Sequence, residues 1–256
     1  MVKYISEVFM VLREYLKQLG SAAIAFSGGV DSAYLLCEAV RSGIKLRAYY
    51  VKSDFQPQFE LEDAKRLAEE LGADMKVLEL DALKDPRVAA NPSERCYFCK
   101  QNIFTNIIEA AKADGFANLL DGTNASDDAG DRPGMRALRE LNVKSPLRDC
   151  GLTKDEIRRL SKEAGLFTWN KPAYACLATR IPTGCEITKE ILKTTEKAEE
   201  MLMAMGFSDF RIRYMGGAAR IQLKEEQISL LTEKRSEITE ALKPLYSAVL
   251  FDLEVR

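Results

Sequence analysis

A short glycine-containing segment constrains the fold of this chain more than any other feature. The apolar run Ala22-Ala23-Ile24-Ala25-Phe26 ends at Ser27-Gly28-Gly29-Val30-Asp31-Ser32, and a helical pattern follows to about Arg41. Glycines let a backbone approach an anion closely, and a helix N-terminus offers N–H groups and the positive end of the helix dipole. The segment therefore predicts an anion-binding turn, with a serine-capped turn that binds nothing as the alternative. It is not a Walker A loop, because no Gly-Lys-Ser/Thr follows.

Strand and helix patterns alternate through the first half of the chain. Strands are expected at 46–51, 75–80 and 118–120, and helices at 59–71 and 91–113. The second helix has a start signal, with Asn91 as the cap, Pro92 in the first helical position and Glu94 three residues after the cap. This alternation predicts an α/β fold with a doubly wound, mainly parallel sheet, which binds ligands at the carboxyl ends of its strands.

The second half of the chain has a different pattern. Thr153 and Glu156 form a capping box that opens a helix to about residue 164, and residues 166–186 show little periodicity. A small α+β domain is expected beyond residue 187, with helices to 205 and over 225–242 and strands at 210–214, 219–223 and 248–255. The predicted division is a first domain at 1–170, an active-site linker at 171–186 and a small domain for substrate binding or oligomerisation at 187–256.

Composition excludes several kinds of chemistry. The chain has 256 residues and a net charge of −2, and it contains no histidine, so histidine triads, histidine bases and histidine-ligated zinc are ruled out. The near-neutral charge argues against a surface built mainly for nucleic acid. No apolar segment is long enough for a membrane span, and the N-terminus does not resemble a signal peptide. We expect a cytoplasmic protein, in which structural disulfides are rare.

The six cysteines therefore call for other roles. Cys96 and Cys99 are three residues apart in an expected helix, so they share one face and can bind a metal or undergo redox chemistry. Two half-buried thiols without function are the alternative. Cys176 is the best candidate for a third ligand, because Lys171 and Arg180 nearby favour a thiolate. The other three have weaker roles: Cys185 is a competitor for Cys176, Cys37 is expected in the core, and Cys150 has no supporting context.

The loop at 27–32 resembles the PP-loop of the ATP pyrophosphatase superfamily, whose members split ATP between the α and β phosphates. The resemblance implies that the loop holds the β,γ-phosphates, that Asp31 is linked to Mg²⁺, and that Ser53, after the second strand, lies near adenosine. An acidic residue at a helix start is also favoured by the dipole alone. The implied nucleotide-binding residues are Ser27, Gly28, Gly29, Asp31, Ser32, Ser53 and Gly122.

Further segments make the resemblance more specific. The chain resembles the LarE-type family of ATP-dependent sulfur transferases, which help to make the nickel-pincer nucleotide cofactor of lactate racemase. The resemblance covers nearly the whole chain. It includes Asp121-Gly122-Thr123-Asn124 with Asp127, Asp128 and Asp131-Arg132-Pro133-Gly134, Trp169-Asn170-Lys171, the segment 176–184, and Phe210-Arg211-Ile212-Arg213-Tyr214 with Ala219-Arg220-Ile221.

The resemblance implies a substrate and a mechanism. ATP adenylates a carboxylate of pyridinium-3,5-biscarboxylic acid mononucleotide and releases pyrophosphate, and a sulfur nucleophile then displaces AMP. Cys176 is the implied catalytic residue, and loss of its sulfur would consume the protein. Members with three cysteines resemble enzymes that hold a [4Fe-4S] cluster, so we expect Cys96, Cys99 and Cys176 to ligate one and Cys176 not to be consumed.

Arginines and aspartates complete the implied site. The guanidinium groups of Arg180, Arg211, Arg213 and Arg220 suit a phosphate and carboxylates, although each arginine could instead be solvated or ion-paired. Arg211 and Arg213 alternate onto one face of a strand, which favours a shared anion site. Asp127, Asp128 and Asp131 either position Mg²⁺ or substrate, or form a solvated loop.

Three rival functions remain. A tRNA thiolase shares the ATP chemistry but predicts a basic RNA-binding surface. An amidotransferase synthetase leaves Cys96, Cys99 and Cys176 unexplained, and a regulatory nucleotide-binding module predicts no release of pyrophosphate. For partners we expect a small-molecule mononucleotide, no nucleic acid, no membrane, and a homo-oligomer, which family precedent makes a hexamer.

Overall fold

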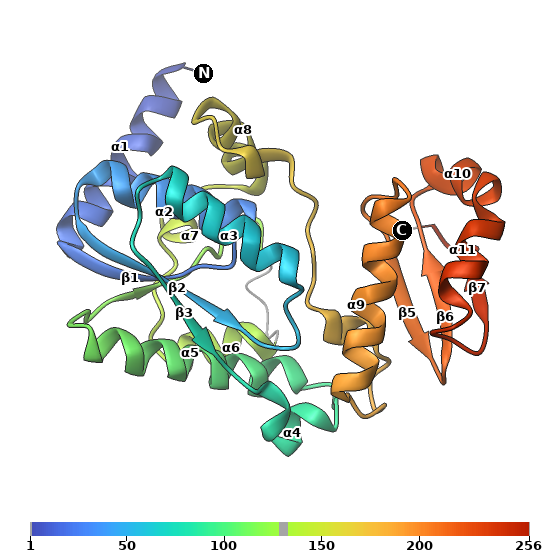
Figure 1. Ribbon diagram of the computed structural model, residues 1–256. Coiled ribbons are helices and arrows are strands. Elements are labelled where there is room, and N and C mark those ends of the chain that lie inside the picture. The colour runs from blue at the N-terminus through green and yellow to red at the C-terminus, as the bar shows by residue number, and fades with distance from the viewer. Residues whose placement is uncertain (1, 128–132, 256) are drawn as a thin grey trace. The chain divides into compact units, whose positions relative to one another are not determined.

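The computed structural model describes residues 2–127 and 133–255, with side chains described from residue 11 onward. The chain forms two compact units (Figure 1). The first unit comprises Met1–Ser53, Gln58–Leu80 and Cys96–Lys171, and the second comprises Asp54–Pro57, Asp81–Arg95 and Pro172–Arg256. This partition places two short segments, at 54–57 and 81–95, with the C-terminal part of the chain, whereas the division expected from sequence kept them in the first domain.

The first unit is a parallel sheet covered by helices on both faces. Its four strands lie in the order β3-β2-β1-β4, and every pairing between neighbours is parallel. The predicted doubly wound α/β fold is confirmed. The elements that build this unit are α1 Val2–Leu19, β1 Ser21–Ala25, α2 Val30–Ser42, β2 Lys45–Lys52, α3 Gln58–Glu70, β3 Met75–Glu79, α5 Arg95–Ala113, β4 Leu119–Leu120, α6 Pro133–Glu140, α7 Pro146–Asp149, α8 Lys154–Glu163 and the 3-10 helix η2 Phe167–Asn170.

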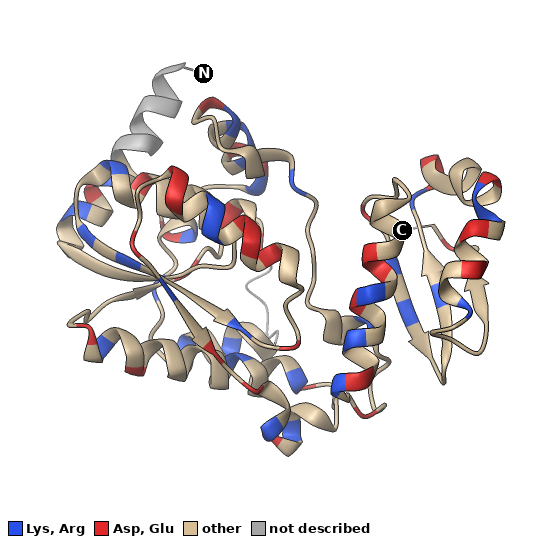
Figure 2. Cartoon of the chain, viewed as in Figure 1, with Lys and Arg blue, Asp and Glu red and all other residues tan. Residues whose placement is uncertain are grey.

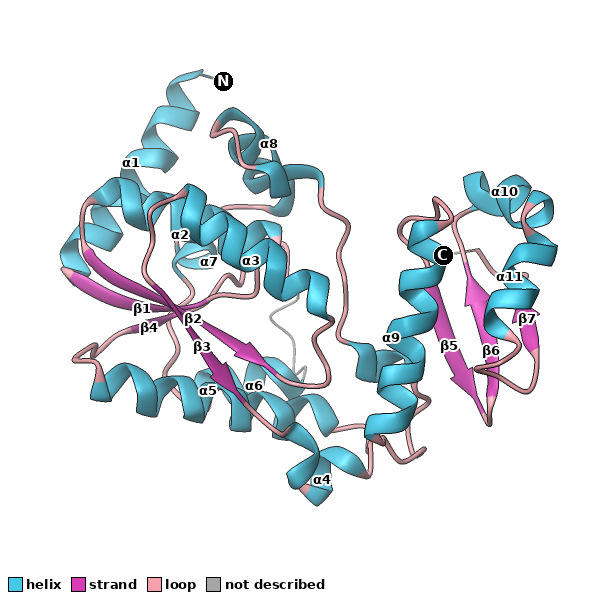
Figure 3. Cartoon of the chain, in the orientation of Figure 1, coloured by secondary structure: helices cyan, strands magenta, loops and turns pink. Residues whose placement is uncertain are grey.

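Alternating side chains of the strands supply two separate cores. Ala22 and Ile24 of β1 pack into one core with apolar residues of α1, α2, α3 and α8. Ala23, between them, points to the opposite face and packs with α5 and α6. Figure 3 shows α2 and α3 on one side of the sheet and α5 and α6 on the other. Because both faces are covered, the central strand β1 is an apolar run rather than a polar–apolar alternation.

The second unit is a small sheet with helices packed on one side. Its strands lie in the order β5-β6-β7, with β5 and β6 antiparallel and β6 and β7 parallel. β5 and β6 form a hairpin, and its turn contains Gly216 and Gly217, both with positive φ. The elements that build this unit are η1 Ala82–Lys84, α4 Pro86–Ala89, η3 Leu177–Arg180, α9 Lys189–Ala204, β5 Arg211–Met215, β6 Ala218–Gln222, η4 Glu225–Gln227, α10 Ile228–Glu233, α11 Arg235–Leu242 and β7 Val249–Phe251.

Three details of the expected secondary structure are wrong. The helix expected over 91–113 begins only at Arg95, because Asn91 has a φ of 53° and is not its cap. The helix expected over 225–242 is divided at Lys234, whose φ and ψ of −91° and 11° leave helical geometry. The last strand is confined to Val249–Phe251. No helix in the described part of the chain combines the length and apolar character needed to cross a bilayer.

Candidate functional site

The predicted nucleotide-binding residues share one edge of the first unit's sheet. The loop at 27–32 follows β1, Ser53 follows β2, and Gly122 follows β4. Since β2, β1 and β4 are parallel neighbours, these segments meet at the carboxyl ends of the strands. This is the edge at which open α/β sheets bind ligands. Ser53 is buried there, with 6% of its surface exposed.

Gly28 and the two serines give the loop its shape. Gly28 has a φ of 72°, and a Cβ at this position would lie 3.1 Å from the Cβ of Ala64. Both the backbone conformation and the space therefore require glycine. The Ser32 hydroxyl lies 3.1 Å from the Ser27 hydroxyl and donates to the Gly29 carbonyl at 3.2 Å. The serines thus brace the turn that leads into α2.

Gly122 brings the end of β4 against the start of α2. A Cβ at this position would lie 2.8 Å from the Ser32 backbone nitrogen, so no side chain fits. The N-cap residue of α2 is Gly29, and within the described structure this helix start has no side-chain cap. Its first N–H groups and its dipole therefore face the loop, which gives the loop the chemistry of an anion site.

Asp31 is paired with a lysine that the sequence reading did not single out. Lys154 Nζ lies 2.5 Å from Asp31 Oδ2, and the Asn124 amide donates to Asp31 Oδ1 at 3.3 Å. Lys154 is the first residue of α8, and the predicted capping box of Thr153 and Glu156 is confirmed directly before it. The capping box predicted where α8 begins, but only the fold shows that this helix start lies beside the PP-loop.

The aspartates after β4 stabilise their own loop where they are described. The Asn124 backbone N–H donates to Asp127 Oδ2 at 2.9 Å, and Arg148 donates to the Asp127 carbonyl at 2.8 Å. The Asp121 carboxylate accepts hydrogen bonds from the hydroxyl of Thr123 at 2.5 Å and from that of Ser145 at 2.7 Å. Asp128 and Asp131 lie outside the described residues.

Cys96 and Cys99 lie in the first turns of α5, in the first unit. Cys96 is exposed and Cys99 is partly buried. Tyr97, between them, donates to Glu140 at 2.7 Å, and the Arg136 guanidinium lies 4.2 Å from the centre of the Tyr97 ring. These contacts hold the start of α5 to α6. The three-residue spacing places the two thiols on one face of the helix, as expected.

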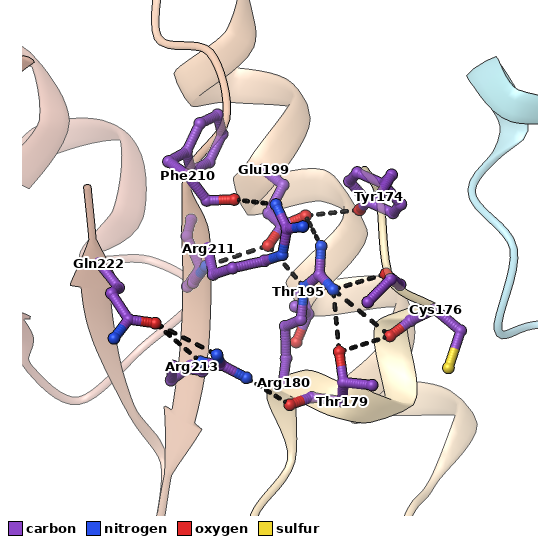
Figure 4. Close-up of polar contacts among 12 residues, drawn as sticks. Tyr174, Cys176, Thr179, Arg180, Thr195, Glu199, Phe210, Arg211, Arg213 and Gln222 are labelled. Carbon is purple, nitrogen blue, oxygen red and sulfur yellow. Dashed lines mark hydrogen bonds and ion pairs between the residues drawn. The ribbon is translucent and has the colours of Figure 1, made fainter. Parts of the chain in front are cut away.

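Cys176 lies in the second unit, in a segment whose carbonyl groups are held by arginines. Arg180 donates to the carbonyls of Ala175 at 2.6 Å and Cys176 at 3.3 Å. Arg211 donates to the Ala173 carbonyl and Arg213 to the Thr179 carbonyl, both at 2.6 Å. Figure 4 shows the Cys176 carbonyl facing Arg180 while its sulfur points away from the arginines. The arginines therefore fix the backbone that carries the thiol.

One buried carboxylate, that of Glu199, partly neutralises the positive charge of these arginines. Glu199 of α9 accepts from Arg180 Nε at 2.9 Å, from Arg180 Nη2 at 3.0 Å and from the Ile212 N–H at 3.0 Å (Figure 4). Arg180 and Arg211 are 1% and 5% exposed. Burial, together with the neighbouring Arg180 cation, lowers the pKa of Arg211 to about 10. A group of three arginines and one glutamate has an excess of positive charge, which favours an anionic ligand.

The remaining predicted residues have different surroundings. Arg220 lies on β6 opposite Arg213, and its Nε is 3.4 Å from Asp252 Oδ2. Cys37 is buried in the first core, and burial raises its pKa. Burial also raises the pKa of Cys150 to about 11. Cys185 is partly buried in the second unit.

The chemistry of the thiols fits an iron–sulfur cluster. All six cysteines are thiols, and Cys96, Cys99 and Cys176 each reach the surface at least in part. Thiolates are the usual ligands of such clusters. Among the described side chains, those of 11–127 and 133–255, no three cysteine, aspartate or glutamate residues gather in a way that could hold a metal ion. The three-cysteine set combines residues of both units, and it stays a prediction.

The sheet order, the glycine-bounded loop and its anion-binding helix start define a PP-loop α/β protein. In agreement, the family of the queuosine biosynthesis protein QueC matches residues 21–96, from β1 to the start of α5. The pyridinium-3,5-bisthiocarboxylic acid mononucleotide synthase of Lactiplantibacillus plantarum is 34% identical over 83% of this chain and 78% of its own length. The chain belongs to the family of this synthase, the LarE family.

Two other relatives show how far the likeness extends. The protein slr1717 of Synechocystis is 37% identical over 85% of this chain and 81% of its own. The tRNA-specific 2-thiouridylase MnmA of Pseudothermotoga lettingae is 28% identical over 58% of this chain and 53% of its own. The likeness to the thiouridylase therefore spans only part of either protein.

Proposed function

We propose that this chain is an ATP-dependent sulfur transferase that acts on pyridinium-3,5-biscarboxylic acid mononucleotide. The observation that carries the proposal is the 34% identity to the synthase across most of both chains, together with an intact PP-loop. The proposed product is a thiocarboxylate for the nickel-pincer cofactor of lactate racemase, and the proposed location is the cytoplasm.

The proposed first step is adenylation of a substrate carboxylate. A carboxylate oxygen attacks the α-phosphorus of ATP, the bond from that phosphorus to the β-bridging oxygen breaks, and pyrophosphate leaves. The role of the loop is to hold the β,γ-phosphates with the N–H groups at the start of α2 and the hydroxyls of Ser27 and Ser32. Asp31 is the carboxylate that would bind Mg²⁺, and Ser53 and Gly122 are the further residues proposed to bind the nucleotide.

The proposed second step is sulfur transfer to the acyl-adenylate. A sulfur nucleophile attacks the acyl carbon, and the carbon–oxygen bond to AMP breaks. AMP is a far better leaving group than the original carboxylate oxygen, and a thiolate or sulfide needs no histidine to activate it. Arg211, Arg213 and Arg220 are proposed to bind the substrate's phosphate and second carboxylate. Arg180 has most of its donors committed to Glu199 and to the carbonyls of Ala175 and Cys176, so its proposed contribution is mainly to the position of Cys176.

Cys96, Cys99 and Cys176 are the residues proposed to hold a [4Fe-4S] cluster. Held by these three thiolates, such a cluster would supply sulfide for the transfer step. The alternative is sacrificial transfer. The Cys176 thiolate attacks the acyl carbon and displaces AMP, which gives a thioester; loss of the Cα proton to solvent with cleavage of the Cβ–S bond then releases the thiocarboxylate and leaves dehydroalanine in the protein. The thiol points away from the arginines that hold its backbone, which is compatible with either route (Figure 4).

Mass spectrometry of an anaerobic reaction tests the proposal. The reaction contains reconstituted protein, Mg-ATP, sulfide and the pyridinium biscarboxylate nucleotide. Exchange of substrate oxygen for sulfur, with AMP formed and the protein mass unchanged over several turnovers, supports the cluster route. The same product with protein that has lost the elements of H₂S supports the sacrificial route. A nucleotide without sulfur rejects the proposed substrate.

Iron and sulfide analysis separates the two routes independently. Cys96→Ala and Cys99→Ala are expected to lose the iron that reconstituted wild type binds, and to lose multiple-turnover activity. Cys150→Ala is the matched control, since it removes a partly buried thiol of the first unit that is assigned no part in the cluster. Full activity in both Cys96→Ala and Cys99→Ala would reject the cluster.

Thiolation of tRNA is the second candidate function, because the thiouridylase MnmA is among the relatives. Its likeness covers little more than half of each chain. Figure 2 shows basic and acidic residues together on most helices of both units, where a tRNA enzyme needs a concentrated basic surface. Incubation with unmodified tRNA, ATP and sulfide tests it directly, and thiolated tRNA would favour this function over the first.

A homo-oligomer is also proposed, and light scattering measures its mass against 28.7 kDa for one chain.

A further inference from the structure

The lysine at the start of α8 reaches into the PP-loop from a segment that carries none of the loop motif. Lys154 Nζ lies 2.5 Å from Asp31 Oδ2, and these two residues are separated by 123 positions in sequence. Both belong to the first unit. Their side chains are 31% and 22% exposed, so the pair lies at the surface of the loop rather than in the core.

The backbone of Lys154 is fixed even though its side chain is long. The Lys154 N–H donates to the Ser126 hydroxyl at 2.9 Å, and the Ser126 N–H donates to Asn124 Oδ1 at 2.8 Å. Asn124 in turn donates to Asp31. The start of α8 is therefore tied to the segment after β4, beside the loop. A lysine ammonium on a flexible stem can change partners from such a fixed base.

The charges in the loop indicate why Lys154 would change its partner when a polyphosphate binds. The helix start of α2, the loop N–H groups and the serine hydroxyls all favour an anion, whereas the Asp31 carboxylate repels one. Lys154 neutralises this carboxylate. A polyphosphate that arrives with Mg²⁺ brings both a cation for Asp31 and phosphate oxygens for an ammonium group.

We propose that Lys154 is a phosphate-binding residue of this loop, and that it exchanges Asp31 for the β,γ-phosphates when Mg-ATP binds. The inference rests on the proposed use of ATP at the loop. It assigns α8 a part in nucleotide binding that the loop motif does not contain. Because the contact is to the phosphates that leave as pyrophosphate, the lysine distinguishes ATP and pyrophosphate from AMP.

Binding measurements on the full chain test this assignment. Calorimetry gives the Kd of Mg-ATP, Mg-pyrophosphate and AMP for wild type, Lys154→Met, Lys154→Arg and the control Lys162→Met. Lys162 lies two turns further along the same helix, is exposed and faces the Trp169 ring. Lys154→Met is expected to weaken ATP and pyrophosphate about tenfold, roughly 1.4 kcal/mol, and AMP less than twofold. Lys154→Arg is expected to regain part of the loss.

An unchanged Kd for ATP in Lys154→Met would overturn the proposal, and so would an equal loss of AMP binding. Lys154 could also act only through Asp31, so a second measurement uses pyrophosphate without Mg²⁺ in an Asp31→Asn background. Direct contact predicts that adding Lys154→Met still weakens binding severalfold there, whereas no further change shows that the lysine only neutralises Asp31. Failure of sulfur transfer in wild type with these binding differences intact rejects the proposed substrate and leaves the assignment of Lys154 standing.

Discussion

Glu199 is a single negative charge among three arginines of the second unit. It accepts hydrogen bonds from Arg180 and the Ile212 backbone, and the Tyr174 hydroxyl donates to it at 2.5 Å. Its side chain is 2% exposed. Removing one partner from a buried ion pair leaves the other charge uncompensated, which costs more than the pair itself contributes. Glu199 is therefore a positioning residue for the Cys176 segment, acting through Arg180.

Replacing Glu199 tests this role. Glu199→Ala is expected to lower the free energy of unfolding by about 3–5 kcal/mol, because Arg180 and Arg211 then repel each other without compensation. Urea denaturation measures the change, with Glu190→Gln on the exposed first turn of α9 as the control. Glu199→Gln keeps some hydrogen bonds and is expected to fold, but to lose sulfur transfer more than formation of the adenylate. Equal losses in both steps would contradict a role centred on Cys176.

The thiols are expected to differ in reactivity because their pKa values and exposure differ. At pH 8 a thiol with a pKa of about 11 has roughly one thiolate in a thousand molecules, so Cys150 is expected to resist iodoacetamide. Its alkylation rate is expected to rise about tenfold per pH unit up to that pKa. Cys37, buried and with a raised pKa, is also expected to resist, whereas Cys96 is exposed. Peptide mapping by mass spectrometry reads all sites at once, and Cys150 reacting as fast as Cys96 at pH 8 would contradict the assignment.

At the scale of elements, local sequence patterns predicted helices and strands correctly, except where a side chain forms its hydrogen bonds with residues distant in sequence. The strands around the PP-loop and the Thr153 capping box followed from local sequence. Asn91-Pro92 with Glu94 also matches a helix start, yet the helix begins at Arg95. The Asn91 amide instead donates to the carbonyls of Ile181, Pro182 and Cys185, about ninety positions away. No local pattern contains those partners.

Asn91 is accordingly expected to stabilise the 181–185 segment rather than a helix end. Asn91→Asp replaces a donor by an acceptor that faces three carbonyl oxygens, so it is expected to cost about 2 kcal/mol or more. Asn106→Asp makes the same chemical change on the exposed face of α5 and is the control, with an expected effect within about 0.5 kcal/mol. Thermal or urea unfolding measures both. Similar small losses in the two variants would show that the three hydrogen bonds contribute little.

At the scale of the whole molecule, the parts of the site that are continuous in the chain could be predicted from the sequence. The PP-loop is one hexapeptide, and its glycines and serines act on one another, so its character was readable from sequence. The arginines and the glutamate near Cys176 come from η3, α9 and β5, which are separate in sequence. Lys154 and Asp31 are likewise distant in sequence, and the fold of the first unit brings them together. Charge and residue type suggested that the arginines bind anions, but not that their donors first hold the backbone of residues 173–179.

The separation of the PP-loop and Cys176 into different units predicts that the two half-reactions can be separated by mutation. Cys176→Ala is expected to keep substrate-dependent exchange of labelled pyrophosphate into ATP, because adenylation needs no thiol, and to lose sulfur transfer. Gly28→Val is expected to lose both, since a side chain there meets Ala64 and the φ of 72° disfavours any β-branched residue. Circular dichroism checks that both variants fold. Loss of exchange in folded Cys176→Ala would mean that the thiol takes part in adenylation, and retained exchange in Gly28→Val would remove the loop from phosphate binding.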